Sequence, residues 1–272
     1  MTQSNLFLRT VSAMIAAPLV VYLVLLGDLI LLILLSIIAI MEARELDVLF
    51  DTLGAKPFRG VAFLLSLLVL WSTYVPMLLM VALGVGLLSY LLLPLLFFHQ
   101  NTPLRLGTTA LVPLISGLLP SYVLRLRAGA WEGGSSEQAV MISIMILVFV
   151  WVADSGAYFT GRALGKKPLA PVISPKKTWE GYIGGALVVS LVAFLAKLFW
   201  LGDRLPVTIL VGLVIICGLI APFGDLTESA LKRTAGVKDS GVMLPGHGGV
   251  LDRIDSILIA FPLAYLFLYF VD

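Results

Sequence analysis

Charge, cysteine and histidine are all scarce in this sequence. Only 12% of its 272 residues are charged, against 60% hydrophobic residues, a balance that excludes an ordinary water-soluble domain. The single cysteine, Cys217, excludes an intrachain disulfide, and we interpret it as a small buried apolar residue. One cysteine and two histidines also argue against a zinc site. The chain must therefore use lipid as its main solvent.

Apolar runs as long as a bilayer crossing, about 20 residues, fill most of the chain. They predict an all-α, polytopic integral membrane protein with about nine transmembrane helices. The candidate spans are 11–27, 29–42, 58–73, 77–97, 106–124, 139–155, 181–200, 206–224 and 251–271. The first run is interpreted as a membrane anchor, because apolar character resumes directly after Asp28.

Most of the 18 lysines and arginines fall on one side of this layout. The positive-inside rule then predicts a cytosolic N-terminus, in a multi-pass protein of the cell (inner or plasma) membrane. Residues 1–138 are expected to be an N-terminal hydrophobic helical scaffold, and 139–272 a C-terminal transmembrane catalytic region. Two cytosolic polar loops, within 151–181 and 224–256, are dense in Gly, Lys, Asp, Ser and Pro. Chemistry is expected in these loops.

Carboxylates gather at the predicted ends of three spans. Asp225 and Glu228 are three residues apart, as are Asp252 and Asp255, so each pair shares a helix face. Asp154 ends a third span at the same predicted depth. Clustered acids repel one another unless a cation or a basic partner lies among them, and hard oxygen ligands favour Mg²⁺. The simpler alternative is a set of interfacial acids paired with nearby lysines and arginines.

The first polar loop places two lysines before a span. Ser174 followed by Pro175 predicts a helix start, so Lys176 and Lys177 would oppose the dipole of its first turn. A bound anion would relieve this conflict. Alternatively, the two lysines only anchor the loop among lipid headgroups.

The second polar loop combines glycines with basic residues. Glycine lets backbone N–H groups approach phosphate oxygens, and lysine and arginine neutralise them. The composition of Lys232–Gly241 and Leu244–Asp255 therefore predicts a polyphosphate-binding loop, although the Walker A ending is absent. His247, between two glycines, is predicted to contact phosphate or to carry a proton.

The run from Ser229 to Asp255 resembles the signature of the phosphatidate cytidylyltransferase family, through Lys232-Arg233, Lys238-Asp239 and Pro245–Gly249. Asp154–Tyr158 and Ser174–Gly181 are similar to the same family. The resemblance implies metal-dependent transfer of CMP from CTP to phosphatidate at the cytosolic membrane interface, giving CDP-diacylglycerol and pyrophosphate. It implies CTP, phosphatidate and membrane lipid as partners, with no nucleic acid. It also implies Mg²⁺ as the metal. A second cation and a homodimer are left open.

The same resemblance carries roles onto individual residues. The expected catalytic residues are Asp225, Asp252, Asp255, Lys232, Arg233, Lys238, Asp239 and His247. The expected substrate-binding residues are Asp154, Ser174, Lys176, Lys177, Glu180, Ser229, Gly246, Gly248, Gly249 and Arg253. The expected metal ligands are Asp225, Glu228, Asp252 and Asp255.

Two other functions would also use parts of this pattern. A CDP-alcohol phosphotransferase also uses carboxylates and metal in a membrane, but its characteristic Asp-Gly and Ala-Arg motif is absent from the sequence. A transporter or flippase for an anionic lipid or nucleotide would also suit basic glycine loops beside broken helices. Transporters usually carry paired repeats and midplane sites, whereas here no repeat is visible and the charges collect at one interface.

Overall fold

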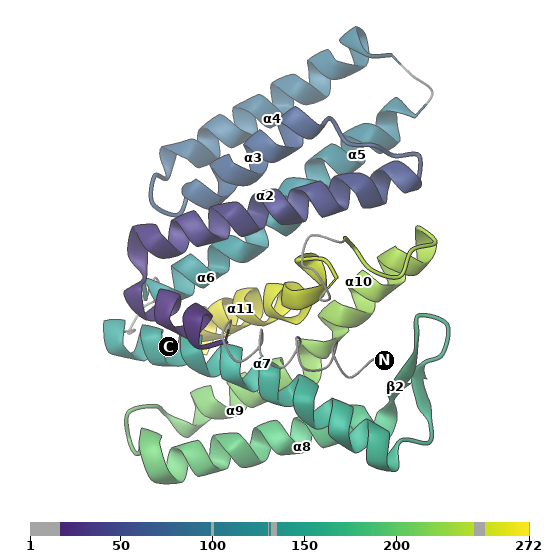
Figure 1. Cartoon of the computed structure of the whole chain (residues 1–272). Helices are drawn as coiled ribbons and strands as arrows, with labels where there is room; N and C mark the ends of the chain where they lie inside the picture. Colours follow the sequence, from purple (N-terminus) through teal and green to yellow (C-terminus); the bar gives the residue numbers. More distant parts are fainter. Residues whose placement is uncertain (1–16, 99–100, 130, 132–134, 242–247, 272) are drawn as a thin grey trace. The chain divides into compact units, whose positions relative to one another are not determined.

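The computed structural model describes residues 17–98, 101–129, 131, 135–241 and 248–271, and these are mostly helical (Figure 1). Six helices in this part of the chain are long and apolar enough to cross a membrane: Met77–Leu96, Thr102–Arg127, Ser136–Leu164, Trp179–Leu201, Val207–Thr234 and Leu251–Val271. Large apolar side chains point outward from several of them, such as Met80 (75% exposed) and Leu95 (79% exposed). Such surfaces suit contact with lipid. The prediction of a helical, multi-pass membrane protein is confirmed.

Three of the expected spans do not qualify by length and composition. Span 58–73 forms α3 (Arg59–Trp71), whose 13 residues rise about 20 Å, less than the hydrocarbon core of about 30 Å. Span 29–42 is part of α2 (Asp28–Thr52), which continues into a charged segment. Span 11–27 lies partly outside the described residues, and a short apolar helix, Ala17–Leu26, covers its end. The count of about nine and the orientation of the N-terminus stay predictions.

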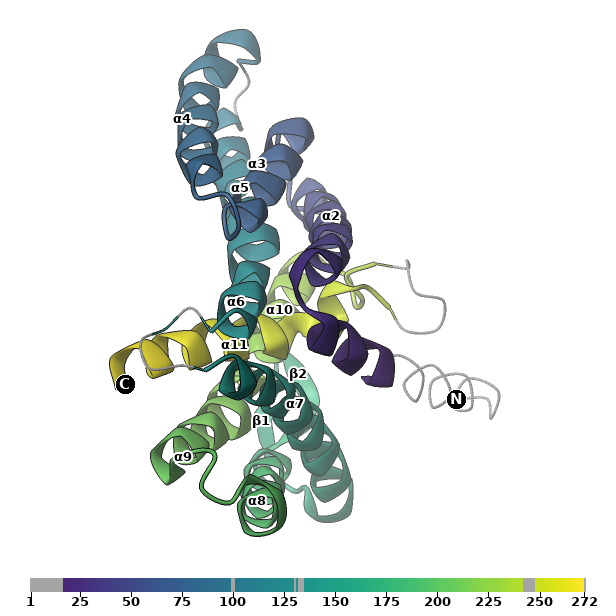
Figure 2. The same cartoon turned by 90° about the vertical axis from the view of Figure 1, so that its left-hand side faces the viewer.

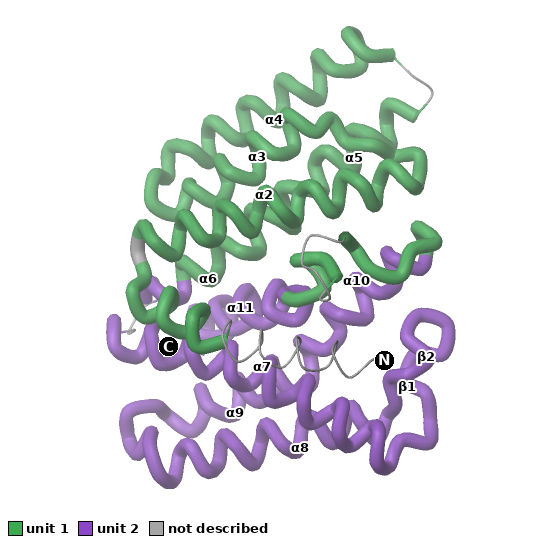
Figure 3. The backbone as a smooth tube through the Cα atoms, in the orientation of Figure 1, with its two compact units in different colours: residues 1–125, 234–253 green, residues 126–233, 254–272 purple. Residues whose placement is uncertain are grey.

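The chain forms two compact units (Figure 3). Unit 1 comprises residues 1–125 and 234–253, and unit 2 comprises residues 126–233 and 254–272. The segment after Thr234, which contains much of the second polar loop, thus belongs with the N-terminal helices. The boundary predicted at residue 138 separates a scaffold from a catalytic region by function, and it stays a prediction.

In unit 1, α3 packs against α2, α4 (Met77–Leu96) and α5 (Thr102–Pro113) (Figures 1 and 2). A π turn, Leu114–Leu118, continues α5 into α6 (Leu119–Arg127). Within it, a Cβ on Gly117 would lie 2.6 Å from the carbonyl oxygen of Ser66, so the glycine is required for this close approach. The hydroxyls of Ser66 and Ser116 are 2.9 Å apart there. Two buried polar groups thus satisfy each other inside an apolar bundle.

Unit 2 is built on a tight pair of helices, α7 and α8. Its elements are α7 (Ser136–Leu164), β1 (Pro168–Ala170), β2 (Ser174–Thr178), α8 (Trp179–Ala196), the π turn Lys197–Leu201, α9 (Val207–Ile215), the π turn Ile216–Ile220, α10 (Pro222–Thr234) and most of α11 (Leu251–Val271). A Cβ on Gly181 would lie 2.8 Å from the oxygen of Ala157, and one on Gly185 would lie 2.7 Å from that of Ala153. Small residues four apart on both helices therefore let the two backbones touch, as is common between helices in membranes.

The prediction that a helix begins at Ser174 is wrong. Ser174–Thr178 forms strand β2, which pairs antiparallel with β1, and α8 begins at Trp179. Thr178 caps α8, because its side chain accepts a hydrogen bond from the Gly181 N–H at 3.1 Å. The first helical turn then carries Glu180, which suits the helix dipole. Lys176 and Lys177 lie on the strand, so the conflict that called for an anion disappears.

Candidate functional site

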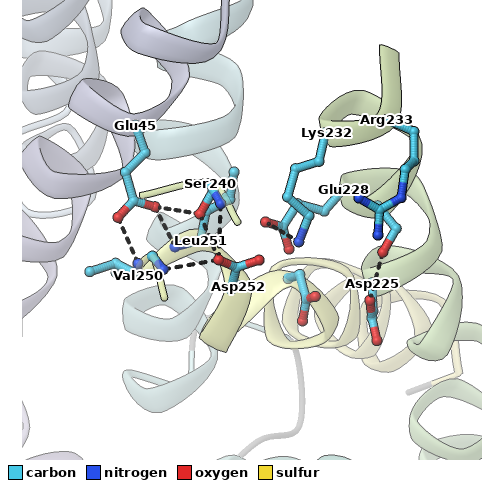
Figure 4. Close-up of polar contacts among 12 residues, drawn as sticks. Glu45, Asp225, Glu228, Lys232, Arg233, Ser240, Val250, Leu251 and Asp252 are labelled. Atoms are coloured by element: carbon cyan, nitrogen blue, oxygen red, sulfur yellow. Dashed lines mark hydrogen bonds and ion pairs between the residues drawn. The ribbon is translucent and has the colours of Figure 1, made fainter. Parts of the chain in front are cut away.

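Asp225, near the start of α10, is held by two side chains of unit 2. The Lys177 ammonium lies 2.6 Å from Asp225 Oδ2, and the Ser229 hydroxyl donates to Asp225 Oδ1 at 3.2 Å (Figure 4). The lysine comes from β2 and the serine from the next turn of α10. The β1–β2 hairpin of the first polar loop and helix α10 thus meet at the Asp225 carboxylate.

A second ion pair lies one turn further along α10. Lys232 Nζ is 3.2 Å from Glu228 Oε1, and the two residues are only 7% and 4% exposed. Glu228, Ser229 and Lys232 thus form a buried polar part of α10, whereas Asp225 is half-buried.

Asp154 of α7 joins this group through its charge. It interacts electrostatically with Asp255, Asp225 and Lys177. α10 and α11 approach closely here, because a Cβ on Gly224 would lie only 2.4 Å from the Asp255 carbonyl oxygen. Three acidic side chains from three helices of unit 2 thus act on one another, with one lysine among them.

The donors in this cluster suit a hard cation. Among the described residues, no group of three Asp, Glu, His or Cys side chains is arranged to hold a metal by itself. Mg²⁺ does not need such a cage, because it usually takes one or two carboxylates and completes its shell with water and substrate phosphates. Asp225, Glu228 and Asp255 offer such carboxylates.

The first polar loop is fixed by backbone contacts. The Glu180 carboxylate accepts hydrogen bonds from the N–H groups of Lys166 at 3.0 Å and Lys167 at 3.2 Å. Arg233 Nε donates to the carbonyl oxygen of Ile173 at 3.3 Å. Ser174 is half-buried and Lys176 is exposed. In this structure Glu180 and Arg233 therefore hold the loop itself.

Unit 1 contains a second cluster, around Asp252 at the start of α11. Asp252 Oδ2 accepts from the Ser240 N–H at 3.1 Å, the Ser240 hydroxyl at 3.0 Å and the Gly249 N–H at 2.9 Å (Figure 4). Gly248 has a φ of +78°, which favours glycine. These contacts fix how the Asp252 carboxylate is oriented. Lys238, Asp239 and Arg253 are exposed, whereas Gly246 and His247 lie outside the described residues.

Sequence reasoning missed Glu45 of α2, which contacts the same segment. Its carboxylate accepts hydrogen bonds from the N–H groups of Val250 at 2.7 Å and Leu251 at 2.9 Å. The available signal was the charged run Glu42–Asp47, which interrupts an apolar helix. Backbone N–H groups predicted to meet phosphate thus meet the protein's own carboxylates.

Ion pairs and carboxylates lie on the helices of this membrane protein beside its polar loops, and such groups usually mark a functional site rather than a plain hydrophobic anchor. The model of the cytidylyltransferase family matches residues 7–271. The chain therefore belongs to the cytidylyltransferase family and is a nucleotidyltransferase.

Relatives named phosphatidate cytidylyltransferase support this assignment. The protein of Staphylococcus aureus strain COL is 34% identical over 269 residues, which cover 96% of this chain and 98% of the relative. That of Bacillus subtilis strain 168 is also 34% identical, with 96% of each chain covered. The protein of Haemophilus influenzae is 42% identical over 181 residues. That match covers 64% of this chain and 60% of the relative.

Proposed function

We propose that this protein transfers CMP from CTP to phosphatidate, leaving CDP-diacylglycerol in the membrane and releasing pyrophosphate. The observation that carries the proposal is the polar face of α10, where the half-buried Lys177 and Asp225 form one ion pair and the buried Lys232 and Glu228 form another. A cytidylyltransferase needs basic side chains that neutralise the charge of the triphosphate. It also needs carboxylates that bind a metal. The name of the relatives supplies the lipid substrate.

In the proposed reaction, a phosphate oxygen of phosphatidate attacks the α-phosphorus of CTP. The new P–O bond forms as the bond to pyrophosphate breaks, and pyrophosphate leaves with the electron pair. Because the attacking phosphate is already anionic near neutral pH, no strong base is needed. Positioning and charge neutralisation then supply most of the catalysis. Lys177 and Lys232 are the proposed phosphate-neutralising groups, with Arg233, Lys176 and Lys238 beside them in sequence.

We further propose that the reaction depends on Mg²⁺. Asp225 and Asp252 would be its principal ligands, and Glu228 and Asp255 would assist. When bound, the ion would neutralise charge on the CTP phosphates. The electrostatic interaction of Asp154, Asp225 and Asp255 with one another favours such a role, because a cation among clustered carboxylates relieves their repulsion. A second cation is part of the same hypothesis.

The proposal is tested by pyrophosphate release from purified protein in detergent. Release is expected from CTP only when phosphatidate is present, and diacylglycerol, which lacks the attacking phosphate, should not replace it. A transporter would release no pyrophosphate under any of these conditions. A CDP-alcohol phosphotransferase would act on CDP-diacylglycerol instead of CTP. Either result would contradict the proposal.

The proposed active site faces the cytosol, which holds CTP, so both polar loops should be on that side. Cysteines introduced in a Cys217→Ser background at Val172, in the first loop, and at Thr234, in the second, test this. Both positions are exposed. A membrane-impermeant thiol reagent should label them only in inside-out vesicles. A cysteine at the exposed Asp203 should be labelled only in right-side-out vesicles.

Labelling of Val172→Cys and Thr234→Cys from opposite sides would contradict a single cytosolic site. The transporter would then become the better candidate. Ser240 is a poorer labelling position, because it is buried and bonded to two carboxylates.

A further inference from the structure

We infer that Glu45 of α2 is a positioning residue for this reaction. It holds Ser240 and the segment from Gly249 to Asp252 so that the Asp252 carboxylate keeps its orientation. The inference rests on the proposed function, since it assigns Asp252 to the reaction. It gives a part in the chemistry to a helix that the sequence assigned to a hydrophobic scaffold.

The Glu45 carboxylate is fully engaged by this segment. Oε1 accepts from the Val250 N–H at 2.7 Å, and Oε2 accepts from the Leu251 N–H at 2.9 Å and lies 2.9 Å from the Ser240 hydroxyl (Figure 4). Glu45 is only 3% exposed. The two backbone donors lie at the start of α11, where N–H groups have no partner within the helix and the dipole favours a negative charge. Glu45 thus caps α11, although it is about 200 residues away from the start of that helix in the sequence.

Ser240 links Glu45 to Asp252. Its hydroxyl lies 2.9 Å from Glu45 Oε2 and 3.0 Å from Asp252 Oδ2, yet it has a single hydrogen to donate. The position of either carboxylate therefore affects the bonding of the other. Such coupled networks hold reacting groups in place, and losing an outer member weakens the group that it orients.

Two glycines of the second loop make room for this carboxylate. A Cβ on Gly249 would lie 2.5 Å from Glu45 Oε2 and 1.9 Å from the Ser240 hydroxyl. One on Gly241 would lie 2.8 Å from Glu45 Oε1. Close approach by a glutamate from the same chain thus accounts for glycines at both positions. The sequence pattern alone had assigned them to close approach by phosphate.

The test compares Glu45→Gln and Glu45→Ala with Asp51→Asn. Asp51 is on the same helix, but it is exposed and pairs with the exposed Lys56. Glu45→Gln keeps the size of the side chain. Its amide N–H₂, however, faces a backbone N–H donor where a carboxylate oxygen accepted a hydrogen bond. We expect its kcat per folded molecule to fall about 10- to 100-fold, with the KM for CTP little changed. Asp51→Asn should keep the wild-type kcat.

Hydrogen exchange provides a readout that is independent of activity. In Glu45→Ala the amides of Val250 and Leu251 lose their acceptor, so they should exchange faster than in the wild type, whereas amides within α3 and α4 should not change. The Asp51→Asn variant should show wild-type exchange at both amides. If Glu45→Ala does not fold, the Glu45→Gln variant provides both readouts.

Either of two results would overturn the inference. One is a wild-type kcat in folded Glu45→Gln, which would reduce Glu45 to a structural staple. The other is unchanged exchange at Val250 and Leu251 without the carboxylate. Wild-type protein that transfers no CMP would instead overturn the proposed function and with it the role in catalysis. The exchange measurement would still decide whether Glu45 holds the segment.

Discussion

Replacing Asp252 by asparagine is expected to lower kcat for CMP transfer about a thousandfold, which corresponds to about 4 kcal/mol of transition-state stabilisation. The amide has nearly the shape of the carboxylate, and its oxygen can still accept from the N–H groups of Ser240 and Gly249. Folding should therefore survive, whereas the negative charge proposed to bind Mg²⁺ is lost. Steady-state rates over a Mg²⁺ titration and thermal unfolding in detergent measure the two effects separately.

The matched control is Asp203→Asn, the same chemical change on an exposed side chain away from both clusters. It should leave kcat and the unfolding temperature as in the wild type. Near-normal activity of Asp252→Asn at saturating Mg²⁺ would show that the charge at this position is not needed. The three hydrogen bonds to Asp252 Oδ2 would then describe a loop anchor only.

Local spacing predicted the polar face of α10 well. The spacing of Asp225 and Glu228 predicted that both lie on one face of a helix, and α10 has this arrangement. Glu228 is buried on that face, whereas Asp225 is half-buried beside Lys177. The same reasoning failed at Ser174. A cap-like Ser-Pro pair competes there with strand pairing to Pro168–Ala170, and only the tertiary structure shows that pairing prevails.

The role of Glu45 could not be predicted for a different reason. Its partners Val250 and Leu251 are 205 and 206 residues away, and nothing in the local pattern of α2 specifies which backbone it meets. The charged run Glu42–Asp47 indicated only that this part of the helix contacts polar groups. The length of α3 was also misjudged from the sequence, because this helix is mostly apolar but has only 13 residues.

Gly224→Ala is expected to lower kcat about a hundredfold, the scale of loss expected when reacting groups move by about 1 Å. The added Cβ would lie 2.4 Å from the carbonyl oxygen of Asp255 and 2.9 Å from its carbonyl carbon. Backbone atoms cannot rotate out of the way as a side chain can, so α10 and α11 must move apart. That movement would separate Asp225 from Asp255, whose charges now act on each other. Overpacking of this kind also costs about 1–3 kcal/mol of stability.

Gly107→Ala in α5 is the control, because a Cβ there meets nothing within 4 Å. It should keep the wild-type kcat and gain slightly in stability, since alanine favours a helix over glycine by about 1 kcal/mol. Both variants are compared by CMP transfer per folded molecule and by thermal unfolding. If Gly224→Ala folds and turns over like the wild type, the spacing of α10 and α11 does not set the reactive geometry. The assisting role proposed for Asp255 beside the ligand Asp225 would then have to be abandoned, because the geometry of a Mg²⁺ site could not tolerate the displacement.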